Sequence, residues 1–295
     1  MEQLKGAVAV GFLRLFALLP WRAVQAVGAG LGWLMWKIPS RSRDVVHINL
    51  SKCFPELNAQ QLSDLERRTH RDIGRLLCES ACAWIWPAHK TLKLIRQVEG
   101  LEVMQQALAS GKGVIGIATH IGNWEVLNHY FCSQCNPIIF YRPPKLKALD
   151  ELLQKQRVQL GNRVAPSTKE GILSVIKEVR RGGVVGIPAD PEPAESSGLF
   201  VPFCGIQALT SKFVPGMLTG GKATAFFING FRLEDGSGFK VVIEPAPPAM
   251  YSEDVAVATA AMSAMVEKYV RAYPSQYLWS MKRFKKRPAG ETKWY

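Results

Sequence analysis

The chain has 295 residues, 47% hydrophobic and 21% charged, so it is long enough to bury a substantial core. Its mean hydropathy of +0.01 is far below that of a polytopic membrane protein and excludes that class. The formal net charge of +13 favours a polyanionic partner: nucleic acid, an anionic membrane face, or an acidic protein or substrate.

The N-terminal segment carries two apolar stretches, residues 6–19 and 23–36, separated by a Pro-Trp-Arg turn. Each is shorter than the roughly 20 apolar residues that a transmembrane helix needs. Interspersed arginines and tryptophans favour a helix pair at the membrane interface or one tilted span, and the G-x-x-x-G at 28–32 permits close helix packing. A cleaved signal peptide and an ordinary buried helical hairpin are the alternatives. We therefore expect residues 1–38 to be a membrane anchor and residues 39–295 to form one folded domain.

Helical and strand patterns alternate after this segment, beginning with a capped amphipathic helix at Asn58 and Gln61. Further helices are expected at residues 101–108, 124–131, 145–160, 170–180 and 253–272. Strands are expected at 114–118, 137–141 and 184–187, followed by a hairpin of 223–231 and 239–243. This alternation predicts an α/β fold with a mixed, mostly parallel sheet flanked by helices.

A histidine and a glutamate follow the first of these strands. Ligands of parallel α/β sheets bind beyond the carboxyl ends of the strands, where His120 is expected. On one continuous helix, His120 and Glu125 would diverge by about 140°. They meet only if His120 lies in the turn before the helix, Asn123 caps it, and Glu125 lies on its first turn. We then expect Glu125 to hold one imidazole nitrogen while the other acts as a general base. The alternative is a loop histidine beside a solvated glutamate.

The chain has no G-x-S-x-G elbow, and no cysteine is set among the expected partners of a histidine. A His–Glu pair without its own nucleophile would deprotonate one on the substrate, such as a hydroxyl.

Two arginines and an aspartate are expected on the same rim. Leucines at helical spacing mark the inward face of the helix at 145–160, and Arg157 falls on that face. A guanidinium keeps its charge and is unfavourable to bury unpaired, so Arg157 needs an anionic partner in the interior or the pocket. The alternative is an arginine whose head extends to the helix edge. Arg142 and Asp190 follow the next two expected strands. This convergence suits acyl transfer to a hydroxyl on an anionic acceptor.

Other motifs carry weaker signals. Cys78, Cys82, Cys132 and Cys135 could be drawn as a four-thiolate zinc site, but their apolar surroundings favour buried structural thiols. We expect neither a metal nor a cofactor. The basic run at 282–287 fits a nucleic-acid patch, a solvated tail, or a contact with a membrane and a carrier protein. No nucleic-acid-binding motif accompanies it, so we expect no nucleic acid partner.

Several segments of the sequence resemble a known family. His120 and Glu125 are similar to the H-x4-D/E box of glycerolipid-type acyltransferases. Later segments narrow the resemblance to the bacterial lipid A biosynthesis acyltransferases, the lauroyl and myristoyl transferases of lipopolysaccharide assembly. Those segments match in order over nearly the whole chain: Tyr141-Arg142-Pro143, Arg157, Asp190, Phe200-Val201-Pro202-Phe203 with Gly205, and the residues from Gln276 to Pro288.

The resemblance implies an enzyme anchored to the cytoplasmic face of the inner membrane, with its anionic surface as one partner. It would move a fatty acyl group from acyl carrier protein to a hydroxyl of a Kdo-bearing lipid A precursor. His120 would be the base and Glu125 its orienting carboxylate, and we place Asn123, Arg142, Arg157 and Asp190 at the substrate site. One alternative is a related acyltransferase making a glycerolipid or another bacterial lipid. The alternative from another class is a basic, membrane-associated nucleic-acid-binding protein.

Overall fold

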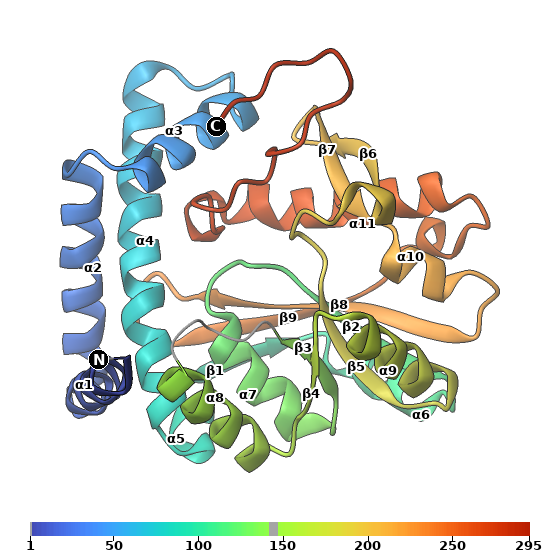
Figure 1. Cartoon of the computed structure of the whole chain (residues 1–295), viewed down its shortest axis with the longest axis horizontal. Helices are drawn as coiled ribbons and strands as arrows, with labels where there is room; N and C mark the ends of the chain where they lie inside the picture. The colour runs from blue at the N-terminus through green and yellow to red at the C-terminus, as the bar shows by residue number, and fades with distance from the viewer. Residues whose placement is uncertain (1, 142–146) are drawn as a thin grey trace.

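The computed structural model describes residues 2–141 and 147–295, and its centre is a seven-stranded sheet of the kind predicted (Figure 1). The strand order is β1-β9-β8-β2-β5-β3-β4, and neighbouring strands are parallel except in the β8–β9 hairpin. The bounds of these strands are β1 Ile95–Glu99, β2 Gly113–Ala118, β3 Ile138–Tyr141, β4 Arg163–Pro166, β5 Val184–Pro188, β8 Ala223–Arg232 and β9 Phe239–Pro245.

Helices cover both faces of this sheet, because its central strands are apolar on both sides. On one face, α6 and α7 share a buried cluster with Val114 and Phe226. On the other face, α9 and α11 share a cluster with Ile115 and Phe227. The helices are α1 Glu2–Phe16, α2 Trp21–Lys37, α3 Arg41–Cys53, α4 Ala59–Ile85, α5 Ala88–Leu92, α6 Leu101–Ala109, α7 Trp124–Gln134, α8 Lys147–Gln159, α9 Lys169–Arg180, α10 Phe213–Leu218 and α11 Val255–Ala272.

The predicted central strands and the β8–β9 hairpin are confirmed, and so is the Asn58–Gln61 capping box that begins α4. The edge strands β1 and β4 were not predicted. Both are short and mostly exposed, so they lack an apolar run. A two-stranded antiparallel hairpin of β6 (Gly198–Phe203) and β7 (Ile206–Ser211) packs against α11 and was also missed.

The two apolar N-terminal stretches form α1 and α2, and α2 runs alongside α4 (Figure 1). Glycines make this approach close. A Cβ atom added at Gly28 would lie 2.6 Å from the Cα of Arg75, and one at Gly32 would lie 2.1 Å from the carbonyl oxygen of His70. Gly74 of α4 faces the same seam, since its Cβ would lie 2.2 Å from the carbonyl oxygen of Gly28. The G-x-x-x-G thus mediates close helix packing, as the sequence indicated.

Within residues 2–141 and 147–295, no helix has both the length and the apolar character required to cross a bilayer. The predicted anchor therefore has no confirmed transmembrane span.

The glycine seam gives a stability test. Replacing Gly32 with Ala forces α2 away from α4, because the new methyl group would meet backbone atoms that have no freedom to move aside. We expect Gly32→Ala to lower the free energy of unfolding by about 1–3 kcal/mol, as in overpacked cores. Denaturant unfolding of the purified protein followed by circular dichroism measures this change.

Gly30→Ala is the matched control in the same helix. Nothing lies within 4 Å of a Cβ at Gly30, so Ala should keep the fold and add up to about 1 kcal/mol of helix propensity. Equal free energies of unfolding for Gly32→Ala and Gly30→Ala would contradict the close packing of α2 against α4 at Gly32.

Candidate active site

His120 and Asp190 are brought together by the register of two parallel strands. In that register Ala118 of β2 pairs with Pro188 of β5, and the backbone N–H of Ala189 donates to the carbonyl of Ala118 (2.9 Å). His120 and Asp190 each lie two residues beyond this pair. The carboxyl ends of β2 and β5 therefore present the two side chains to each other at the edge where ligands of such sheets bind.

Asp190 holds His120 through two hydrogen bonds. The imidazole Nδ1 lies 2.9 Å from one carboxylate oxygen, and the backbone N–H of His120 donates to the other at 3.0 Å. An ionised carboxylate only accepts, so Nδ1 carries a proton and the lone pair of the neutral ring is on Nε2. The Asp190 side chain is fully buried, whereas that of His120 is 24% exposed. His120 is thereby oriented as a base whose free nitrogen is accessible.

The charges of this pair support each other. Burial alone would lower the pKa of His120, but the negative charge of Asp190 and its hydrogen bond outweigh burial and raise this pKa. Glu125 adds a smaller upward effect. Burial would likewise raise the pKa of Asp190, and the interaction with His120 reverses this, so that its pKa is lowered. Asp190 is therefore ionised and His120 is a stronger base than an isolated imidazole.

The prediction that Glu125 orients His120 is wrong. The carboxylate that contacts the imidazole is Asp190, because the β2–β5 register places it there, while Glu125 lies on the first turn of α7. Glu125 instead lines the same cavity as His120. The ring of Trp124 packs edge-on against His120, with ring centroids 4.8 Å apart. Glu125 thus acts on His120 through its charge and not through a hydrogen bond.

Asn123 caps α7 as the sequence predicted. Its side-chain oxygen accepts from the backbone N–H groups of Glu125 and Val126, each at 3.0 Å. Asn123 is fully buried, and its side-chain nitrogen donates to Glu79 (3.0 Å), so in this structure its polar atoms are bonded within the protein. Asp190, which we also place at the substrate site, is likewise buried and is bound to His120.

A cavity of about 360 Å³ opens beside His120, within the usual ~300–1,000 Å³ of ligand sites. Its walls are mainly apolar, and its polar lining includes His120, Glu125 and Arg157. Apolar lining comes from Trp84, Leu127, Phe131, Ile139, Leu153 and Ile228, and the glycines Gly116 and Gly186 also border it. Such a space suits a hydrocarbon chain whose reactive end lies at the imidazole.

Arg157 lines this cavity, so the inward face predicted from its helical phase is confirmed. Its guanidinium lies 4.3 Å from the ring centroid of Tyr141, at cation–π distance. Nη1 of Arg157 is buried and has no hydrogen-bond partner among the described residues. Arg157 is therefore a cation on the cavity wall, of the kind that suits an anionic or carbonyl group. Arg142 lies outside the described residues.

The basic run at 282–287 divides between interior and surface. Arg283 is buried, and its guanidinium donates to the carbonyl of Leu209 (2.8 Å) and to the hydroxyl of Thr210 (2.7 Å). Arg287 donates to the carbonyl of Gln207 at 2.8 Å. These arginines fasten the C-terminal segment to β7, so the run is not a continuous basic patch.

The chain is similar to known proteins over most of its length. The model of the bacterial lipid A biosynthesis acyltransferase family matches residues 4–286. The chain is 27% identical over 284 residues to a lipid A biosynthesis lauroyltransferase of Escherichia coli (strain K12), covering 95% of this chain and 91% of that protein. It is also 27% identical to the lipid A biosynthesis palmitoleoyltransferase (97% and 92% covered) and 24% identical to the myristoyltransferase (95% and 86% covered) of the same organism.

The Asp190 contact predicts how His120 titrates. Because ionised Asp190 favours the imidazolium, the pKa of His120 should lie above the ordinary value of about 6.5. Asp190→Asn removes that charge and should lower the pKa of His120, whereas Glu125→Gln should lower it less. Histidine-selective NMR titration of the folded variants measures these pKa values.

His129 serves as the internal control, because burial lowers its pKa to about 4 and it does not contact Asp190. An unchanged titration of His120 in Asp190→Asn would contradict the pairing.

Proposed function

Because the chain belongs to the bacterial lipid A biosynthesis acyltransferase family, we propose that it transfers a fatty acyl group to a hydroxyl of a lipid A precursor. The observation that carries this proposal is the imidazole of His120, held by Asp190 at the border of an apolar cavity. The relatives' names specify lauroyl, palmitoleoyl and myristoyl groups. All of these are long apolar chains, which the apolar lining of the cavity suits.

In the proposed reaction, Nε2 of His120 takes the proton of the acceptor hydroxyl, and the hydroxyl oxygen attacks the carbonyl carbon of a thioester. The carbon–sulfur bond then breaks, and the imidazolium returns the proton to the leaving thiolate. Asp190 keeps the proton on Nδ1 and stabilises the imidazolium. The charge of Glu125, on the cavity wall, adds to this stabilisation. No covalent acyl-enzyme is required.

We further propose that the donor is acyl carrier protein and the acceptor a Kdo-bearing lipid A precursor. Both are acidic, and the net charge of +13 would steer them toward this chain. Arg157 supports the anionic character of the acceptor or donor, since it is a cation that lines the cavity and its Nη1 has no hydrogen-bond partner in the part of the chain that the structure describes. Arg142, which follows β3, is assigned to the same substrate by its place in the sequence.

We propose that residues 1–38 hold the enzyme on the anionic cytoplasmic face of the inner membrane by lying on it. Large apolar side chains of this segment face outward, among them Phe12 (66% exposed), Leu15 (69%) and Leu18 (78%). On α2, Trp33 is 50% exposed and Leu34 46%. At about 1.5 Å per residue, the 15-residue α1 is shorter than the roughly 30 Å hydrocarbon core, which favours an in-plane arrangement.

The catalytic proposal is tested with purified full-length protein, an acyl carrier protein thioester and a lipid A precursor. His120→Ala removes the base, and kcat should fall by about 10²–10⁴-fold while the circular dichroism spectrum is retained. Asp190→Asn should also be severe, yet add little in the His120→Ala background, because it acts through the imidazole. Glu125→Gln should be milder than Asp190→Asn.

Near-normal turnover by His120→Ala would reject the mechanism. A Glu125→Gln loss that exceeds that of Asp190→Asn would return the orienting role to Glu125.

The membrane proposal predicts that the outward apolar residues drive binding. Replacing Phe12, Leu15 and Leu18 together with Ser should shift the protein from sedimenting with anionic vesicles to the supernatant, because each apolar side chain contributes about 1.5–3 kcal/mol when buried. These side chains are exposed, so the fold should survive.

The matched control replaces three exposed apolar residues elsewhere, Ile172, Leu173 and Val257, with Ser. This control should sediment like the unaltered protein, and equal release of both variants would overturn the assignment of residues 1–38 as the contact.

A further inference from the structure

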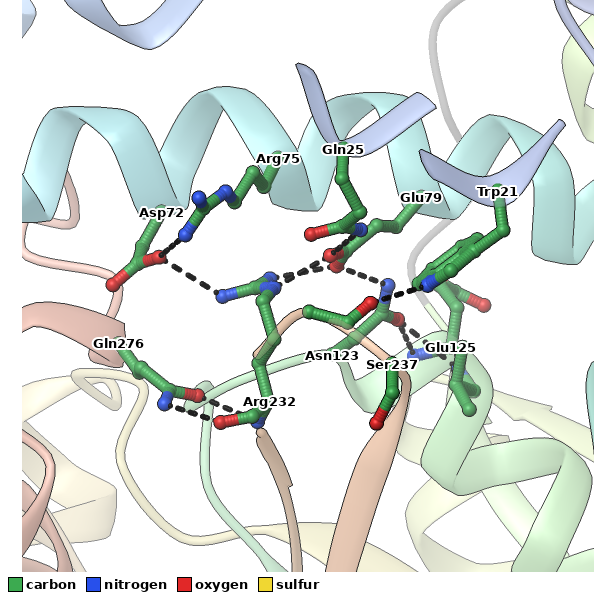
Figure 2. Close-up of polar contacts among 12 residues, drawn as sticks. Trp21, Gln25, Asp72, Arg75, Glu79, Asn123, Glu125, Arg232, Ser237 and Gln276 are labelled. Carbon is green, nitrogen blue, oxygen red and sulfur yellow. Dashed lines mark hydrogen bonds and ion pairs between the residues drawn. The ribbon is translucent and has the colours of Figure 1, made fainter. Parts of the chain in front are cut away.

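Glu79 and Arg232 form a buried ion pair next to the turn that carries Asn123 (Figure 2). Neither residue is among those that line the cavity. Glu79, in the C-terminal part of α4, has a fully buried side chain, and Arg232, at the end of β8, has a side chain that is 3% exposed. Arg232 donates to both carboxylate oxygens, from Nε (2.5 Å) and Nη2 (2.6 Å). Such burial is unfavourable unless both charges are paired and hydrogen-bonded, so the surrounding contacts must be complete.

Two amides complete the coordination of Glu79. Gln25 of α2 donates to one oxygen at 2.6 Å, and Asn123 donates to the other at 3.0 Å (Figure 2). Arg232 also donates to Asp72 at 3.2 Å. One carboxylate therefore joins α2, α4, the start of α7 and the end of β8, which are distant in the sequence.

The ionised state of Glu79 decides how Asn123 is oriented. A carboxylate accepts and does not donate, so it selects the NH₂ group of the Asn123 amide. The amide oxygen is then directed to the N–H groups of Glu125 and Val126, which it caps. Burial would raise the pKa of Glu79, but the charge and hydrogen bonds of Arg232 lower it, so Glu79 stays ionised. If a neutral side chain with an N–H group replaced Glu79, the Asn123 amide could turn over and direct its oxygen to that group instead of to the α7 N–H groups.

The backbone around Asn123 is fastened to the same strand. The N–H of Asn123 donates to the carbonyl of Gly230 (3.2 Å), and the N–H of Gly122 donates to the carbonyl of Gln276 (3.0 Å). Gly122 has φ of 60°, and a Cβ there would lie 1.9 Å from the carbonyl oxygen of Gly230, so only glycine fits. The Gln276 side chain in turn bonds both backbone groups of Arg232 (2.8 and 2.9 Å).

We propose that Glu79 and Arg232 are positioning residues for acyl transfer, acting through Asn123 to fix the turn from His120 to Glu125 and hence the position of the imidazole. Gln25 extends this support to α2, so the N-terminal segment contributes to the geometry of the site. The inference rests on the proposed function of His120. Neither Glu79 nor Asn123 touches the cavity, so their effect falls on turnover and not on donor binding.

The test moves the negative charge from Glu79 to position 123. Asn123→Asp sets a second carboxylate within hydrogen-bond distance of Glu79, where two buried carboxylates cannot both ionise. Glu79→Gln leaves Arg232 without its counter-ion and allows the Asn123 amide to turn. Each single variant should lower kcat by about 10²-fold, the effect of a misplacement near 1 Å, with KM for the acyl carrier protein thioester little changed.

The double variant, Glu79→Gln with Asn123→Asp, restores one donor, one acceptor and one negative charge beside Arg232. Asp caps a helix as well as Asn does, so the α7 N-terminus keeps its acceptor. We expect kcat of the double variant to exceed that of Asn123→Asp by at least about tenfold. No recovery in a folded double variant would overturn the proposal.

Glu178→Gln is the matched control. Glu178 is a nearly buried carboxylate that pairs with Arg163 (3.0 Å) and with Arg181, at the amino end of the sheet where β4 begins. Its loss should lower the melting temperature and leave kcat unchanged below that temperature. An equal loss of kcat in Glu178→Gln would mean that Glu79 acts only through stability.

Two further variants keep the outcomes separate. Arg232→Lys retains the charge and loses the two-pronged geometry, so it should lower kcat about tenfold and serves if Glu79→Gln does not fold. His120→Ala is assayed in parallel. If His120→Ala retains turnover, the proposed function is rejected. If His120→Ala loses turnover while folded Glu79→Gln and Arg232→Lys keep a normal kcat, only the positioning role is rejected.

Discussion

The pairing of β2 with β5 is the constraint on which the site depends. Because Ala118 faces Pro188 across the ladder, the side chains two residues beyond each strand end meet, and they are His120 and Asp190. A slip of one residue would send one of them to the opposite face of the sheet. The contact between His120 and Asp190 is therefore determined by the sheet and not by the short segment that carries His120 and Glu125.

Buried charge supports the turn from two sides. Asp190 holds the imidazole and the backbone N–H of His120 from the β5 side, and Glu79 holds Asn123 from the α4 side. Each carboxylate is fully buried and paired with a cation or a base. Removing one member of such a pair leaves an uncompensated charge, which is far more unfavourable than losing an exposed ion pair. The residues from His120 to Glu125 are thus held more rigidly than a surface loop.

Local sequence patterns predicted the secondary-structure elements around the site, but they did not predict the side-chain contacts between residues that are distant in the sequence. The apolar run of β2, the cap at Asn123 and the inward phase of Arg157 are local signals, and the structure has all three. The partner of His120 was assigned to Glu125 because the two are close in sequence, whereas the register with β5 selects Asp190; comparing the offsets of acids beyond both strands would have found it. Glu79 was missed because a charged residue on an amphipathic helix usually faces solvent.

The N-terminal helices explain why their sequence resembles a membrane anchor. A helix that packs against a globular domain needs one apolar face, and the other face is normally polar. In α2 the inner face is occupied by Gly28 and Gly32 against α4, and its outer face still carries Trp33 and Leu34. Packing within the chain accounts only for the inner face. The outer apolar surface is left exposed, and the proposed membrane contact would bury it while Gln25, on the inner face, stays bound to Glu79.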